Sequence, residues 1–170
     1  MTPGETLFEA GKNKAIRLLL FRSRSTCELR EKLRDKGFPP DTIDEVTRWL
    51  EERGYLDDRS YAENLARVLA VNRLWGNFKI RLSLREKGIP PAFIEEALQA
   101  VRRDLGEREA MEKYMQKKYG KTGEADINSK EFTLGERHRL FRSLSSRGFP
   151  RELIMEIIRM PKEEKIHDGE

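Results

Sequence analysis

Few residues of this 170-residue chain have the types and the spacing that catalysis requires. Asp57 and Asp58 come closest to a pair of catalytic carboxylates, but no further acids stand at the spacing of a metal or nuclease site. They follow a Gly-Tyr-Leu turn, where an aspartate commonly caps the next helix. Cys27 and His138 lack partner residues that would activate a thiol or an imidazole. The sequence also contains no phosphate-binding loop, nucleophile elbow or zinc-protease motif. We therefore expect no enzyme, no metal, no cofactor and no small-molecule substrate.

Basic side chains are the residues best suited to binding a partner. Many lie near the C-terminal ends of expected helices, where the helix dipole favours positive charge. These are Arg34, Lys36, Arg85, Lys87 and Arg147. The dipole does not account for a second set, in or near the turns that open the middle helices: Arg22, Arg24, Arg73, Lys79 and Arg81. With Arg137, Arg139 and Arg142 they are predicted to form a basic stripe that contacts an acidic partner or nucleic acid. A solvated face is the alternative interpretation.

Trp75 is a further candidate contact residue. It lies in the polar turn Asn72-Arg73-Leu74-Trp75-Gly76-Asn77, where a large ring needs either packing or a ligand. Packing against a neighbouring unit is the alternative interpretation for this ring. Trp49, by contrast, shares a helix face with Val46 and Leu50 and is predicted to lie in the core.

These residues belong to an internal repeat, in which three segments align without gaps on Gly37, Gly88 and Gly148. Before each glycine, two apolar residues stand four positions apart; after it, two more stand three apart, as on helix faces. Each glycine suits a left-handed helix end, and the proline two residues later suits the start of the next helix. The predicted inward pairs are Leu29/Leu33, Ile80/Leu84 and Leu140/Leu144, then Ile43/Val46, Ile94/Ala97 and Ile154/Ile157.

A leading helix is expected in each repeat, at Lys14–Phe21, Arg59–Asn72 and Glu107–Tyr119. The predicted fold is therefore all-α: an elongated, curved array of three tandem three-helix repeats. The expected repeats are 10–54, 55–105 and 106–160, with an insertion near 120–129 in the third and a frayed polar tail at 161–170.

Composition sets the broad class. Charged residues make up 38% of the chain and hydrophobic residues 37%, with a net charge of +4. Regular apolar spacing argues against disorder, and no apolar run is long enough to cross a membrane. With one cysteine and no signal-peptide pattern at its start, the chain is expected to be a cytoplasmic monomer without a disulfide.

The central repeat resembles a known family. The run Gly54-Tyr55-Leu56-Asp57-Asp58-Arg59-Ser60-Tyr61-Ala62, followed by Arg73-x-x-Gly76-x-x-Lys79-Ile80-x-x-x-Leu84-x-x-Lys87-Gly88-Ile89, is similar to the signature of the RecX regulatory proteins. The resemblance extends over about residues 10–160. It implies a bacterial cytoplasmic regulator that binds the RecA recombinase. Members of this family lie along the groove of the RecA filament on DNA and restrain ATP hydrolysis and strand exchange during recombination, DNA repair and the SOS response.

The resemblance departs from the family pattern at Trp75, where a lysine or another polar residue is common, and at the insertion after Gly120. Two other interpretations fit a chain of short helices: a helix-turn-helix protein that binds DNA, and a helical scaffold for another protein. Acidic residues near the starts of the candidate recognition helices speak against the first, because they would repel phosphates.

Overall fold

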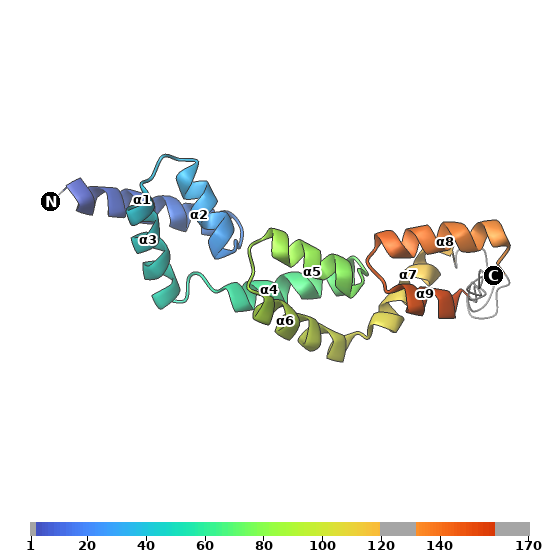
Figure 1. The fold of residues 1–170 in the computed structure, drawn as a ribbon. Helices are drawn as coiled ribbons and strands as arrows, with labels where there is room; N and C mark the ends of the chain where they lie inside the picture. Colours follow the sequence, from blue (N-terminus) through green and yellow to red (C-terminus); the bar gives the residue numbers. More distant parts are fainter. Residues whose placement is uncertain (1–2, 120–131, 159–170) are drawn as a thin grey trace, which may run out of the picture. The chain divides into compact units, whose positions relative to one another are not determined.

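A computed structural model describes residues 3–119 and 132–158 of the chain (Figure 1). Within these ranges the chain forms α-helices and one π-helical turn, with no strand, so the all-α prediction is confirmed. The expected insertion near 120–129 and the expected tail at 161–170 lie outside the described residues. The elements are α1 (Pro3–Phe21), α2 (Thr26–Arg34), α3 (Pro40–Glu52), α4 (Asp58–Arg67), η1 (Val68–Asn72), α5 (Asn77–Glu86), α6 (Pro91–Asp104), α7 (Glu107–Tyr119), α8 (Leu134–Ser146) and α9 (Arg151–Ile157).

The repeated Gly-x-Pro turn forms as the sequence predicts. Gly37, Gly88 and Gly148 have φ angles of +83°, +70° and +83°, the left-handed conformation that ends a helix without cost only at glycine. The helices after these turns begin one residue later than predicted. Pro39 and Pro150 have extended backbone and act as N-cap residues of α3 and α9.

The leading helices differ in how closely they match the prediction. α7 has the predicted bounds, whereas α1 begins eleven residues before Lys14, at Pro3. The leading helix of the second repeat loses its regular α geometry after Arg67 and ends in η1. Two residues after the end of η1, Leu74 has a φ of +52°, which is rare for a residue with a bulky side chain. An irregular backbone therefore leads into the turn that carries Trp75.

The described residues divide into two compact units. The first unit falls within 1–67 and 81–100, and the second within 68–80 and 101–170, so the middle repeat contributes to both. Each unit has its own core. The first is built on Leu29, Leu33, Ile43, Val46 and Leu50, and the second on Met111, Met115, Leu140, Leu144 and Ile154.

The buried positions follow the predicted pattern with two corrections. Trp49 is only half-buried: its ring stacks on Tyr55 at 6.0 Å and is covered by the guanidinium of Arg53, at the edge of the core. Ile157 is also half-buried, because Ile158, one turn after Ile154, takes the inward position at the end of α9. Both residues still pack against the core of their unit.

Candidate binding surfaces

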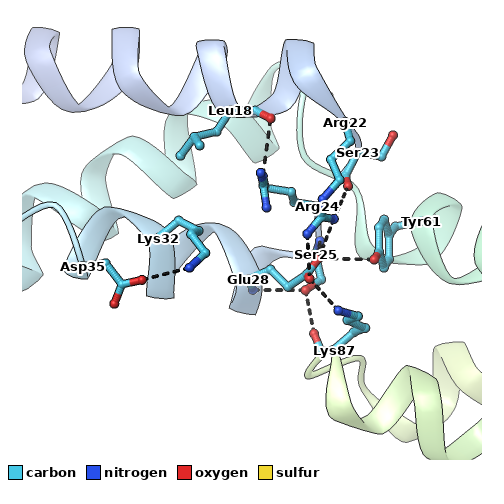
Figure 2. Close-up of polar contacts among 10 residues, drawn as sticks. All are labelled: Leu18, Arg22, Ser23, Arg24, Ser25, Glu28, Lys32, Asp35, Tyr61 and Lys87. Carbon is cyan, nitrogen blue, oxygen red and sulfur yellow. Dashed lines mark hydrogen bonds and ion pairs between the residues drawn. The ribbon is translucent and has the colours of Figure 1, made fainter.

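Arg22 lies in an ionic cluster around the largely buried carboxylate of Glu28, at the start of α2 (Figure 2). Its guanidinium is 3.1 Å from the carboxylate of Glu28, and the amine of Lys87 is 2.7 Å from the same carboxylate. The Tyr61 hydroxyl donates a third hydrogen bond to Glu28, at 3.2 Å. The side chain of Glu28 is only 13% exposed, so this contact joins the first repeat to Tyr61 and Lys87 of the second.

The electrostatics of the cluster favour the ionised carboxylate. Burial alone would raise the pKa of Glu28, but hydrogen bonds and charge from Arg22 and Lys87 outweigh it and hold that pKa at about 2. Burial, with the adjacent Glu28 charge, raises the pKa of the Tyr61 phenol. Arg22 is thus committed to a structural contact within the first unit.

The other two candidate residues of the first unit also have internal partners. Arg24 is half-buried, and its Nε donates to the carbonyl of Leu18 at 3.4 Å. Arg81 forms a two-pronged ion pair with Glu95, at 2.7 and 3.0 Å. Glu95 and Glu96 lie in the second turn of α6 rather than in its first, and Glu96 pairs with Arg59 at 3.1 Å. These acids therefore serve ion pairs within the unit.

In the second unit, the turn before α5 docks on the Gly148 turn of the third repeat. The amide of Gly76 donates to the carbonyl of Arg147 at 2.9 Å, and the amide of Phe78 donates to that of Gly148 at 3.2 Å. A Cβ on Gly76 would clash with the Gly148 carbonyl, and one on Gly148 would clash with the backbone of Lys79. These two glycines are needed for the close approach.

This contact places Arg73, Trp75 and Lys79 together. The Lys79 amine lies 4.5 Å from the centre of the Trp75 ring and donates to the carbonyl of Ser146 at 3.0 Å. Trp75 is half-buried, and it lines a pocket of about 770 Å³ that also involves Arg73, Tyr114, Lys117, Lys118 and Arg147. The Trp75 ring thus packs on the side chain of Lys79 and also lines a pocket, and its role as a contact residue stays a prediction.

The remaining candidate residues lie on α8. Arg137 is half-buried and donates to the carbonyl of Phe132 at 3.0 Å. Arg139 and Arg142 are exposed and form no ion pair with any residue that the structure describes. With Arg73, which is also exposed and forms no ion pair with a described residue, these are the cations of the predicted set most open to a partner.

The residues considered for catalysis have structural roles. Asp57 accepts hydrogen bonds from the amides of Arg59 and Ser60, at 2.9 and 3.1 Å, and so caps α4 as predicted. Asp58 accepts from the amide of Thr26 at 2.7 Å. Among the described residues, no group of three or more His, Cys, Asp or Glu side chains could hold a metal ion. None of the described helices is long and apolar enough to cross a membrane.

Sequence reasoning missed several residues of the Trp75 pocket. It attributed Arg147 to the dipole of α8, whereas its guanidinium stacks on Tyr114 at 3.9 Å and donates to the carbonyl of Arg73 at 2.5 Å. Lys117 and Lys118 lie within a predicted leading helix, and the sequence pattern does not set them apart. The repeat alignment carried a usable signal, because Lys87 and Arg147 both stand directly before the turn glycine.

Comparison with known proteins identifies the family. Residues 12–50 match the family model for the first three-helix domain of RecX, and residues 57–98 match that for the second. Regulatory protein RecX of Chlorobaculum tepidum is 32% identical over 86% of this chain and 84% of its own length. Regulatory protein RecX of Pseudomonas savastanoi pv. phaseolicola is 32% identical over 85% and 87%, respectively. The crystal structure of RecX from Lactobacillus salivarius has the same fold, with a TM-score of 0.74 at 24% identity over 91% of this chain and 96% of that one. The chain therefore belongs to the RecX family of regulatory proteins.

Proposed function

We propose that this protein binds the RecA recombinase and its filament on DNA, and that it restrains ATP hydrolysis and strand exchange. The observation that carries the proposal is the 32% identity to a RecX regulatory protein over 86% of the chain. A protein with this role needs surfaces for a partner and no reaction centre, which agrees with the structural roles of Asp57 and Asp58.

Arg139 and Arg142 are the proposed contact residues for the acidic surface of the filament. They lie three residues apart on α8, so their side chains point to the same side of the helix. Both are exposed, and neither is neutralised by a described acid, whereas Arg22 and Arg81 are. Free surface cations attract acidic protein surfaces and DNA phosphates alike, and salt weakens both contacts.

The test is the DNA-dependent ATPase of RecA, measured with increasing amounts of this protein. We expect inhibition that weakens as salt is raised, and a marked loss of inhibition in the double variant Arg139→Glu/Arg142→Glu. Arg48→Glu, which reverses one charge at an exposed position of α3, is the control. This variant should inhibit RecA like the unmodified protein. No inhibition at a molar excess over RecA would refute the proposed function. Full inhibition by the double variant would refute only the role given to α8.

A further inference from the structure

The two compact units contain the same kind of junction, built at equivalent repeat positions. In the first unit the amide of Thr26, at the start of α2, donates to Asp58, the first residue of α4, at 2.7 Å. In the second, the amide of Asn77, at the start of α5, donates to Glu107, the first residue of α7, at 2.6 Å. Thr26 and Asn77 both stand eleven positions before their turn glycine. The contacts within one junction can therefore be compared with those of the other.

The comparison reveals an exchanged charge. Counted from the turn glycines, the ionic cluster of Arg22, Glu28 and Lys87 corresponds to Arg73, Lys79 and Arg147. In the first junction two cations hold a carboxylate between them. In the second, the position of the carboxylate is taken by Lys79, so all three equivalent positions are basic and none of them pairs with a described acid. Like charges at close range repel, and an anion between them removes the repulsion.

The surrounding pocket adds further positive charge and two aromatic rings. Lys117 and Lys118 line it with Arg73 and Arg147, and none of its described lining residues is acidic. Trp75 and Tyr114 supply the rings. Lys118 donates to the hydroxyl of Ser143 at 3.0 Å, and Arg147 donates to a backbone carbonyl. These partners are neutral, so they orient the cations without neutralising their charge.

The pKa of the Tyr114 phenol reflects the positive charge around the pocket. Burial would raise its pKa, yet that pKa is lowered by the hydrogen bond with Ser143 and by the nearby Arg147 and Lys118. The backbone beside the pocket is also irregular, with the π-helical turn η1 and the left-handed Leu74. Such features are frequent at functional sites, where they aim a side chain. Here they precede Trp75 directly.

We propose that this pocket binds a nucleotide unit, with the phosphate held by Arg73 and Arg147 of its lining and the base against the ring of Trp75, on which Lys79 also packs. Arginine guanidinium groups and lysine amines are the usual protein ligands of phosphate groups, and nucleic-acid bases stack on aromatic rings. An acidic peptide would use the cations but leave the ring without a planar partner. The nucleotide is either free or part of an unpaired strand, since a paired base is not accessible to a ring in a pocket. The inference goes beyond the contact with RecA and is tested without it.

The decisive variant is Lys79→Glu, which places a carboxylate where the first junction has Glu28. By analogy with Glu28, which pairs with Lys87 and Arg22, we expect the new acid to pair with Arg147 and Arg73 and to compete with the phosphate. We expect binding of a fluorescein-labelled oligothymidylate, or of a nucleoside triphosphate, to weaken about tenfold or more, as for a lost charged hydrogen bond. The urea concentration at the unfolding midpoint should stay the same or rise, so the loss of ligand binding would not result from unfolding.

The matched control is Arg103→Glu, with the same change in charge at an exposed position of the second unit, outside the pocket. It should bind within about twofold of the unmodified protein, as expected of a surface charge without a direct contact. In a Trp49→Phe background, the ligand should change the fluorescence of Trp75. For the strand, raising salt should weaken binding with a slope of about −0.7 per phosphate bound, and Lys79→Glu should flatten that slope.

Parallel titrations with different probes separate the sources of the ligand. Binding of the triphosphate alone, of the oligothymidylate alone, or of both supports the proposal and names the source. Binding of neither, or equal weakening by Lys79→Glu and Arg103→Glu, overturns it. Binding of polyglutamate, inorganic pyrophosphate or duplex DNA as tight as that of both nucleotide probes also overturns it, because the base would then contribute nothing. None of these outcomes depends on whether the protein inhibits RecA.

Discussion

Replacing Glu28 by glutamine should destabilise the first unit, because it removes the charge that Arg22 and Lys87 share while keeping the shape of the side chain. The magnitude follows from the pKa of Glu28, which is about 2 in the folded protein against an ordinary value of 4.5. At roughly 1.4 kcal/mol for each pH unit, this difference corresponds to about 3 kcal/mol at neutral pH. The side chains of Arg22 and Lys87 are 45% and 35% exposed, so solvent screening lowers the expected loss to about 1–2 kcal/mol.

The sign of the pH dependence is fixed by the direction of the shift. The pKa of Glu28 is lower in the folded than in the unfolded chain, so its stabilisation is complete above about pH 4.5 and disappears as the pH falls through about 2. The unmodified protein and Glu28→Gln should therefore differ most at neutral pH and converge in acid.

Urea unfolding, followed by circular dichroism at several pH values, measures this difference. With a slope of about 2 kcal/mol per molar urea, the midpoint should fall by about 0.5–1 M at neutral pH. Glu31→Gln is the matched control, because Glu31 is an exposed acid on the same helix and pairs with no described cation. Equal midpoints for the two variants, or a gap that persists in strong acid, would show that the cluster does not hold the first junction together.

Three other experiments test separate parts of the structure. Gly148→Ala should lower the free energy of unfolding by more than about 2 kcal/mol, because Gly148 has a φ of +83° and a Cβ there meets the backbone of Lys79. The control Gly135→Ala has open space around the new Cβ and should not destabilise the protein. Equal effects of the two variants on the urea midpoint would contradict the close approach of the two turns. Asp57→Ala should cost about 1 kcal/mol in the same assay through the lost cap of α4, and an unchanged midpoint would mean that the cap is dispensable. In a tyrosinate absorbance titration, Tyr114→Phe should remove absorbance that develops below the ordinary tyrosine pKa of 10, because the pKa of Tyr114 is lowered. Tyr61→Phe should remove absorbance that develops above 10, because the pKa of Tyr61 is raised. If Tyr114 titrated above Tyr61, the assigned contacts would be contradicted.

Local rules were enough to predict most of the fold. The spacing of pairs such as Leu29/Leu33 and Leu140/Leu144 places both members in a core, and the turn glycines have the left-handed backbone that their position predicts. Such features depend only on neighbours within one or two helical turns. The errors lie at helix ends, as with Ile157, where one residue of shift decides which side chain points inward.

The candidate binding surface is less predictable, because pairing between distant residues decides which cations remain available. Arg22 and Arg139 look alike in the sequence, but Glu28 neutralises the first and no described acid neutralises the second. Arg81 finds its partner fourteen residues away, in the next helix. No local pattern shows whether two side chains from different helices meet, so the predicted stripe included residues that the structure commits to internal ion pairs.

The exchange of Glu28 for Lys79 means that ionic strength acts with opposite sign on the two junctions. Added salt screens attraction in the first, where a carboxylate lies between two cations, and weakens it. In the second, where Arg73, Lys79 and Arg147 gather around the Trp75 pocket, the same salt screens repulsion and relieves it. A stability curve for the whole chain therefore averages two opposing trends, and a flat response to salt would mark their cancellation rather than the absence of electrostatic contacts.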